Sequence, residues 1–205
     1  MQVQSYILPR THIVIDDLFT QEIISKMLIE IETLKERFVP GKMLIDGTYK
    51  FDEKKKVDNI WLDELYRDNR TKSSILNAFK EQFWSDKMRD LLKNHEQALY
   101  ETLLYTAIDA TMISTYSNGD YYLEHTDIGE GLFITVMLML CKEPKKFKGG
   151  DFILHHNDKK KVIEYKNNRV IIFPSKTLHG VMPVELKSTN FMDQRFTIQY
   201  WARNK

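Results

Sequence analysis

The segment YSNGDYYLEHTDIGEGLFITVMLML, residues 116–140, decides the fold class. It holds a turn signal, SNGD, then a short β-prone run, and then an apolar run of strand length. Runs of the same kind recur on both sides of it, separated by the turn signals KGGD (148–151), HNDKK (156–160) and KNN (166–168). The predicted strands are Thr111–Tyr116, Tyr121–His125, Leu132–Leu140, Asp151–Leu154, Lys161–Tyr165, Arg169–Phe173, Gly180–Val184 and Arg195–Ala202. Eight short strands at this spacing predict a double-sheet barrel of the jelly-roll type, also called a double-stranded β-helix.

The part of the chain before residue 108 has a different texture. Two short extended segments, Val3–Leu8 and His12–Ile15, precede a helix that Thr20 can cap. The stripe that would face the core consists of Ile23, Ile24, Met27, Leu28, Ile31 and Leu34. Residues 41–58 resemble a loop or a weak hairpin, and 59–105 a helical block in two or three pieces. The predicted class is therefore α+β, with N-terminal helices packed on one sheet of the barrel.

Length and composition narrow the class of protein. The chain has 205 residues and no internal repeat, which favours a single domain spanning residues 1–205. Within it, residues 1–107 would form a mainly helical support with short strands, and residues 108–202 the jelly-roll core. Its 30 basic and 29 acidic residues leave a charge of +1, which does not favour a dedicated nucleic-acid binder. The single Cys141 excludes an internal disulfide. We expect a soluble, cytoplasmic protein, because the sequence shows no signal peptide and no apolar run that could span a bilayer.

The first chemical signal is His125-Thr126-Asp127, with His179 further along the chain. Residues i and i+2 of a strand face the same way, so His125 and Asp127 can converge on one point at a strand end. Two histidines and one carboxylate form the facial triad that suits iron(II), because three coordination positions stay open. Zinc sites more typically take four ligands, or three richer in histidine or cysteine. The triplet alone is a weak motif, since H-x-D is common by chance.

The final strand, RFTIQYWA (195–202), supplies a second signal. Alternation places Arg195, Thr197, Gln199 and Trp201 on one face, and Phe196, Ile198 and Tyr200 on the other. If the apolar face packs under the helices, Arg195 and Thr197 point into the barrel, where a guanidinium needs a carboxylate partner. The alternative is an edge strand whose arginine reaches solvent.

Residues 108–202 resemble the catalytic core of the prolyl 4-hydroxylase-like branch of the 2-oxoglutarate/Fe(II) oxygenases. The matching pieces, in order, are YSNGDYYLEHTD (116–127), FITVMLML (133–140), KGGDFIL (148–154), NRVIIFPSKTLHGVMPV (168–184) and RFTIQYW (195–201). The ordered set is far more specific than H-x-D. The resemblance implies the cofactors Fe(II), 2-oxoglutarate and O2, with ascorbate as a supporting reductant.

The resemblance also assigns roles to residues. By motif position, His125, Asp127 and His179 are the catalytic metal ligands, and Arg195 binds the C5 carboxylate of 2-oxoglutarate. Tyr116 would contact the co-substrate. Tyr122, three positions before the first ligand, matches a pocket-lining tyrosine of the family.

Two departures from the family pattern affect these assignments. Many relatives carry a tyrosine on the apolar strand that hydrogen-bonds the C5 carboxylate, but Met139 stands at the aligned position, so Thr135 or Thr197 would have to substitute. The stretch ELKSTNFMDQ (185–194) is also longer than is common before the final strand. Lys187 within it is a competing carboxylate anchor, but its polar surroundings favour Arg195.

The remaining histidines and lysines have ordinary explanations. Adjacent His155 and His156 would point to opposite faces of a strand and end it in solvent, and His12 and His95 have no ligand-spaced neighbours. Lysine-rich segments at 54–56, 145–148 and 159–161 fall in predicted loops. The first of them could instead form part of a lid over the site.

The resemblance implies hydroxylation of a C–H bond coupled to conversion of 2-oxoglutarate into succinate and CO2. We expect a protein or peptide side chain as the substrate, with proline as the first guess. A free amino acid or another small metabolite is the alternative, and a jelly-roll binding module with a vestigial site is an alternative of another class. We expect no nucleic-acid or membrane partner, and the sequence does not indicate an oligomeric state.

Overall fold

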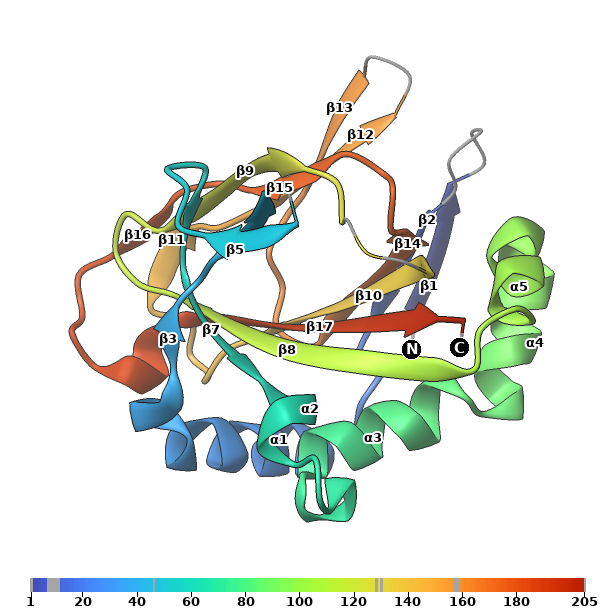
Figure 1. Cartoon of the computed structure of the whole chain (residues 1–205), viewed down its shortest axis with the longest axis horizontal. Coiled ribbons are helices and arrows are strands. Elements are labelled where there is room, and N and C mark those ends of the chain that lie inside the picture. Colours follow the sequence, from blue (N-terminus) through green and yellow to red (C-terminus); the bar gives the residue numbers. More distant parts are fainter. Residues whose placement is uncertain are drawn as a thin grey trace.

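The computed structural model describes residues 2–6, 12–45, 47–127, 129, 131–156 and 159–204. Its strands form two facing antiparallel sheets with helices along the outer side of the larger one (Figure 1). In spatial order the larger sheet contains β1 (Gln2–Tyr6), β2 (His12–Asp16), β14 (Arg169–Pro174), β10 (Leu132–Leu140), β17 (Arg195–Arg203), β8 (Ile108–Tyr116), β7 (Asp58–Trp61) and β3 (Val39–Pro40). The smaller sheet contains β13 (Lys159–Ile163), β12 (Phe152–His156), β15 (His179–Val181), β9 (Tyr121–His125) and β6 (Lys55–Lys56).

Two further strand pairs extend this framework. They are β11 (Phe147–Gly149) with β16 (Val184–Leu186), and β4 (Met43–Ile45) with β5 (Thr48–Lys50). The helices are α1 (Gln21–Thr33), α2 (Leu62–Leu65), α3 (Ser74–Phe83), α4 (Asp86–His95) and α5 (Gln97–Leu103), with 3-10 turns η1 (Lys35–Arg37), η2 (Arg70–Lys72) and η3 (Phe191–Asp193). None of the described helices combines the length and apolar character needed to cross a bilayer. The α+β jelly-roll class expected from the sequence is confirmed.

The large sheet has two different faces because side chains alternate along each strand. On β17, Phe196, Ile198 and Tyr200 join the core that includes the helices. On β14, Val170 and Ile172 belong to that same core, whereas Ile171 and Phe173 pack between the two sheets. The chain therefore has one core under the helices and a second core inside the barrel.

Helix α1 begins where the sequence predicts. The Thr20 side chain accepts a hydrogen bond from the backbone of Ile23 at 3.4 Å, so it caps α1 as expected. The Glu30 carboxylate, on the buried side of α1, accepts from the Ser73 hydroxyl at 2.7 Å and from the backbone of Ile75 at 3.1 Å. This carboxylate joins α1 to the N-terminus of α3, where a negative charge is favourable.

The structure changes the bounds of three predicted elements. The run Gly180–Val184 is split into β15 and β16, because Pro183, between them, has no N–H to donate to a ladder. The helical block begins at Leu62 and not at residue 59, since β7 pairs with β8. Strand β1 ends at Tyr6; Ile7 and Leu8 of the predicted first segment lie outside the described residues.

Candidate active site

The two histidines come from neighbouring strands of the smaller sheet, and Asp127 follows the first of them. His125 ends β9 and His179 begins β15, and the two residues are directly paired in the ladder between those strands. Asp127 is held by a hydrogen bond from its own N–H to the carbonyl of Ser175 at 3.1 Å. The ligand atoms of the three residues all lie within 4.8 Å of one another. Among the described residues they are the one group of histidine, cysteine and carboxylate side chains that could hold a metal ion.

Both imidazoles are oriented by their own backbone. His125 Nδ1 lies 2.8 Å from the carbonyl of Leu123, and His179 Nδ1 lies 2.7 Å from the carbonyl of Thr177. A carbonyl only accepts, so each Nδ1 carries the proton and each Nε2 keeps a lone pair. The Nε2 atoms of His125 and His179 lie 3.8 and 3.6 Å from the same Asp127 oxygen, Oδ1. Histidines that bind a metal generally donate their other ring N–H to a carbonyl or carboxylate, as both do here.

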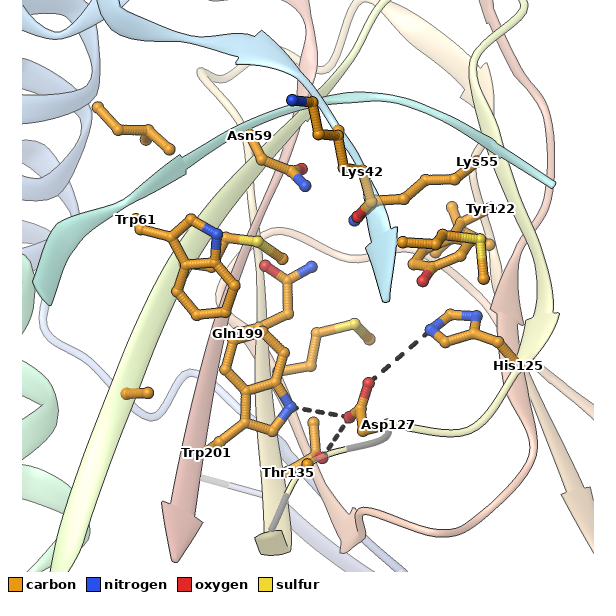
Figure 2. A pocket seen from close by; sticks show the side chains of 18 of the residues that line it. Lys42, Lys55, Asn59, Trp61, Tyr122, His125, Asp127, Thr135, Gln199 and Trp201 are labelled. Carbon is orange, nitrogen blue, oxygen red and sulfur yellow. Dashed lines mark hydrogen bonds and ion pairs between the residues drawn. The ribbon is translucent and has the colours of Figure 1, made fainter. Parts of the chain in front are cut away.

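The two oxygens of Asp127 have different partners. Oδ2 accepts from the Thr135 hydroxyl at 2.6 Å and from Trp201 Nε1 at 2.8 Å, as Figure 2 shows. Oδ1 faces the histidines. Thr135 and Trp201 are directly paired across β10 and β17, so one rung of the large sheet supplies both donors. Asp127 is thereby prepared to bind a metal through one oxygen.

Aromatic rings pack tightly around the histidines. The Tyr122 ring stacks on His125, with centroids 3.5 Å apart and an interplanar angle of 13°. The Phe173 ring packs edge-on against His179, with centroids 4.9 Å apart. Burial, together with the neighbouring His179, lowers the pKa of His125 well below its ordinary value, which favours the neutral imidazole that a metal requires.

Arg195 begins β17 and is completely buried, so the solvent-exposed alternative is wrong. Its Nε donates to the carbonyl of Gly150 at 2.7 Å, and its Cζ lies 4.5 Å from the Tyr116 ring centroid and 5.0 Å from that of Tyr165. The terminal nitrogens Nη1 and Nη2 have no hydrogen-bond partner among the described residues. Two buried donors without acceptors fit a bidentate carboxylate ligand, such as one end of 2-oxoglutarate. The competing anchor Lys187 is exposed.

A cavity of about 1300 Å³ opens over the triad between the two sheets. Tyr116, Tyr122, Thr135 and the three triad residues line it, together with residues of the segment 36–65. Arg195 is not among the residues that line the cavity, whereas Tyr116, whose ring centroid lies 4.5 Å from Arg195 Cζ, is one of them. The cavity is larger than a typical small-molecule pocket, so it has room for a co-substrate and part of a second substrate.

The structure divides the residues predicted from the sequence between two clusters. Tyr122 and Thr135 contact the triad directly. Tyr116 and the buried Thr197 lie instead beside Arg195, and burial raises the pKa of Tyr116. Thr135 uses its hydroxyl on Asp127 and Ser175, and Thr197 accepts from Gln199 at 3.0 Å. The aligned Met139 is buried in the core between the sheets.

Three contributors to the site were not found by sequence reasoning. Trp201 was placed on the same face of the final strand as Arg195, and no role in holding Asp127 was predicted. Tyr165 was placed at the end of a strand without a role. Lys55 belonged to a run interpreted as a loop or lid, and only its pairing with β9 brings it to the cavity. His155 lies outside the site, with Nε2 3.4 Å from Glu124.

Comparison with known proteins agrees with the geometry. Residues 111–203 match the family model of the 2OG-Fe(II) oxygenase superfamily. An uncharacterized PKHD-type hydroxylase of Synechocystis sp. is 32% identical over 107 residues, which is 45% of this chain and 35% of that protein. A PKHD-type hydroxylase of Gloeothece citriformis is 29% identical over 131 residues, 60% of this chain and 57% of that protein. The matches thus span about a third and just over half of the length of these two relatives.

Solved structures share the fold across nearly the whole chain. A Pseudomonas putida prolyl-4-hydroxylase superposes with a TM-score of 0.68 at 15% identity, covering 96% of this chain and 94% of that one. A prolyl hydroxylase from Trichoplax adhaerens, solved with a hypoxia inducible factor peptide fragment, gives 0.69 at 15% identity, covering 94% and 83%. The resemblance inferred from the sequence is confirmed: residues 111–203 are similar to the 2OG-Fe(II) oxygenase superfamily, and nearly the whole chain shares the fold of the superposed prolyl hydroxylases. The matched family implies Fe(II), 2-oxoglutarate and O2.

Proposed function

We propose that this protein is a dioxygenase that hydroxylates a C–H bond of a protein or peptide side chain, with proline as the first substrate to test. His125, Asp127 and His179 hold Fe(II), and Arg195 holds the C5 carboxylate of 2-oxoglutarate. Bound iron(II) and 2-oxoglutarate would supply the chemistry, with O2 as the oxidant: one oxygen atom would enter the hydroxylated C–H bond and the other would enter succinate, with release of CO2. The residues of the chain fix the ligands, exclude water from the inner site and position the substrate.

The observation that carries this proposal is the pairing of two incomplete sites in one barrel. The triad offers two imidazole Nε2 atoms and one carboxylate oxygen to an ion. At the start of β17, two guanidinium nitrogens of Arg195 are buried without an acceptor among the described residues. A decayed binding module would not be expected to keep both, because a buried cation without a partner destabilises the fold.

The choice of a peptide substrate rests on the cavity and on the relatives. The cavity of about 1300 Å³ extends from the triad to the segment that includes β4 and β5, so an extended peptide could lie over the metal. The superposed prolyl hydroxylases act on prolyl residues, as their names state. A free amino acid or small metabolite is the second candidate, and a cation in the cavity, described below, bears on that choice.

A turnover screen tests the proposal. Succinate release would be measured with Fe(II), 2-oxoglutarate and O2 in the presence of proline-containing peptides, free amino acids or methylated oligonucleotides. We expect peptides to stimulate succinate release and to gain one oxygen atom by mass spectrometry. Stimulation by free amino acids alone would replace the peptide substrate with the small-molecule alternative. Absence of 2-oxoglutarate turnover under every condition would contradict the proposal that this protein is a dioxygenase.

A further inference from the structure

Lys55 is a cationic side chain in the lining of the cavity. It lies on β6, directly paired with Tyr122 of β9. Its Nζ is 4.8 Å from the Tyr122 ring centroid, and that ring stacks on His125 with centroids 3.5 Å apart. The ammonium therefore lies no farther from the His125 imidazole than these two distances together. Figure 2 shows Lys55 extending across the cavity from the edge of the smaller sheet.

The hydrogen-bond partners of this ammonium are neutral. Nζ donates to the carbonyl of Lys42 at 3.3 Å. With the Asn59 amide turned so that its nitrogen donates to Ser114 and to the carbonyl of Asp58, Asn59 Oδ1 accepts from Lys55 Nζ at 2.9 Å. An ammonium has three N–H donors, so one remains for a further acceptor.

No carboxylate within ion-pair distance neutralises Lys55 among the described residues. The acidic group that acts on it is Asp127, and both oxygens of Asp127 are already engaged or directed at the histidines. The adjacent Lys56 differs, because its Nζ lies 3.2 Å from Asp120. Burial lowers the pKa of Lys55 to about 8, as expected for a desolvated cation without a counter-ion.

The charge of the surrounding cavity also favours an anion. A divalent metal on the triad would outweigh the single charge of Asp127. Besides Lys55, the described lining includes three further cations, Arg37, Lys42 and Arg203, and two glutamates, Glu36 and Glu64. The C5 carboxylate of 2-oxoglutarate has its own candidate anchor at Arg195, so the cation at Lys55 remains for the molecule that is hydroxylated.

We propose that Lys55 binds a carboxylate of the primary substrate and thereby selects an acidic substrate. This proposal rests on the proposed function and narrows its substrate class. Charge-assisted N–H···O contacts are about 2.8 Å long, so the carboxylate would lie beside the ammonium, in the cavity that the triad also lines. The hydroxylated carbon would then be only a few bonds from the carboxylate. Such a carboxylate could belong to a small carboxylic or amino acid, or to an Asp or Glu side chain beside the target residue of a peptide.

Matched substrates and matched variants test this proposal. The substrates are free amino acids and dicarboxylic acids, and proline-containing peptides with Asp or Glu beside proline, each compared with its Asn, Gln or amide counterpart. The variants are Lys55→Met, which removes the charge and keeps the length, Lys55→Arg, which keeps the charge, and Lys56→Met as the control. Thermal denaturation of each variant verifies that it folds.

We expect acidic compounds to stimulate succinate release more than their neutral counterparts. Lys55→Met should raise the KM for the acidic substrate by about tenfold or more, while Lys55→Arg retains most of the affinity. The KM for 2-oxoglutarate should stay near wild type in every variant, and the control Lys56→Met should also keep the wild-type rate of slow turnover without substrate. The metal-free wild type should also be stabilised against heat by the acidic compound, and Lys55→Met should lose that shift. Stimulation by free acids identifies a small-molecule substrate, and stimulation by acidic peptides identifies a peptide substrate.

Several outcomes would overturn the carboxylate anchor. One is an equal response to acidic and neutral counterparts, or no stimulation by any acidic compound while substrate-free 2-oxoglutarate turnover persists. Another is an unchanged KM for the acidic substrate in Lys55→Met. A rise in the KM for 2-oxoglutarate in Lys55→Met would instead make Lys55 a co-substrate anchor. Each of these outcomes is compatible with the proposed dioxygenase function. A wild type that never turns over 2-oxoglutarate would refute both the carboxylate anchor and the proposed function.

Discussion

Asp127 has two oxygens in different surroundings, and this difference sets how it can bind a metal. Thr135 and Trp201 both donate hydrogen bonds to Oδ2. The other oxygen, Oδ1, faces the Nε2 atoms of His125 and His179. Donors of this kind orient a metal ligand, and losing them commonly costs about 10- to 100-fold in metal affinity or activity. The orientation of one carboxylate therefore depends on two residues of the opposite sheet.

Removing the indole donor should weaken metal binding without removing a ligand. In Trp201→Phe the ring is kept but the N–H to Oδ2 is lost, and we expect Fe(II) to bind about tenfold more weakly. Anaerobic titration with Fe(II) measures this affinity. Trp61→Phe is the matched control, because Trp61 stacks on Trp201 with ring centroids 5.5 Å apart and makes no contact with Asp127 that the structure describes. Equal losses in the two variants would show that ring packing, and not the hydrogen bond, holds the site.

Arg195 should affect the co-substrate and leave the metal nearly unaffected. In Arg195→Ala the two buried donors disappear, so we expect the KM for 2-oxoglutarate to rise by about 100-fold, equivalent to roughly 3 kcal/mol for a lost charge-assisted pair. Fe(II) titration should remain near wild type. Lys187→Ala, at the exposed competing position, should leave both quantities unchanged. If Arg195→Ala lost iron and 2-oxoglutarate to the same degree, Arg195 would be supporting the fold and not the co-substrate.

At the scale of elements, the turn between β11 and β12 holds Arg195 in place. Gly150 has a φ of +69°, and a Cβ there would lie 2.5 Å from Arg195 Cδ and 2.8 Å from Nε. Its carbonyl also accepts from Arg195 Nε. The Gly-Gly turn is therefore needed both for its backbone conformation and for close packing against the anchor.

Alanine at this turn should displace the anchor. Gly150→Ala and Gly119→Ala both force a side chain into positive φ, and each should lose about 1–2 kcal/mol of unfolding free energy. At Gly119, with a φ of +76°, the nearest atom to an added Cβ is Lys56 Nζ at 3.5 Å, an ordinary contact. Only Gly150→Ala should raise the KM for 2-oxoglutarate, by roughly tenfold or more. A similar KM for 2-oxoglutarate in the two variants would show that the turn at Gly150 does not position Arg195.

The seam between β2 and β14 is held by a buried carboxylate. Asp16 accepts from Arg169 Nε at 2.7 Å and from Lys166 Nζ at 3.0 Å. The hydrogen bonds from Arg169, with Lys166, lower the pKa of Asp16 below its ordinary value despite burial. A carboxyl group with a lowered folded-state pKa stabilises the fold above its unfolded-state pKa, and this stabilisation is lost as the pH falls through the folded-state pKa.

Neutralising Asp16 should therefore destabilise the protein near neutral pH and matter less in acid. We expect Asp16→Asn to lose about 2 kcal/mol of unfolding free energy at pH 7. The difference from wild type should narrow as the pH falls below about 4, near the unfolded-state pKa. Asp17→Asn is the control, because the Asp17 carboxylate is more exposed and lies farther from Lys166 Nζ, at 3.7 Å compared with 3.0 Å for Asp16. Urea denaturation at several pH values measures both, and a difference that is constant between pH 3 and pH 7 would contradict the ion pair.

Local sequence predicts the strands with strong periodicity and misses those defined by their partners. Leu132–Leu140 and Tyr121–His125 match β10 and β9, because alternation and turn residues mark their ends. Lys55–Lys56 forms β6 only because β9 offers it an edge, and nothing in a lysine run indicates that pairing. The same limit applies to the site. His125 and Asp127 follow from their spacing, whereas the role of Trp201 depends on its register opposite Thr135.

At the scale of the whole molecule, the two faces of the large sheet have separate tasks. One face packs on the helices (Figure 1), and the other packs against the smaller sheet, which carries the two histidines of the triad. A network on the helical side ties the layers together: Tyr200 donates to Asp109 at 2.9 Å and accepts from Trp84 at 2.6 Å, and Arg70 pairs with Asp109. The helices thus support the strand that begins with Arg195 and carries Trp201.

Anaerobic absorption spectroscopy with Fe(II) and 2-oxoglutarate reports on the triad and the co-substrate site at once, and it needs no substrate. We expect a weak visible charge-transfer band with the wild type. The band should disappear in His179→Ala, and in Arg195→Ala it should require a much higher concentration of 2-oxoglutarate. A folded wild type that gives no band, or a His179→Ala variant that gives the same band, would contradict the assignment of His125, Asp127 and His179 as the iron centre.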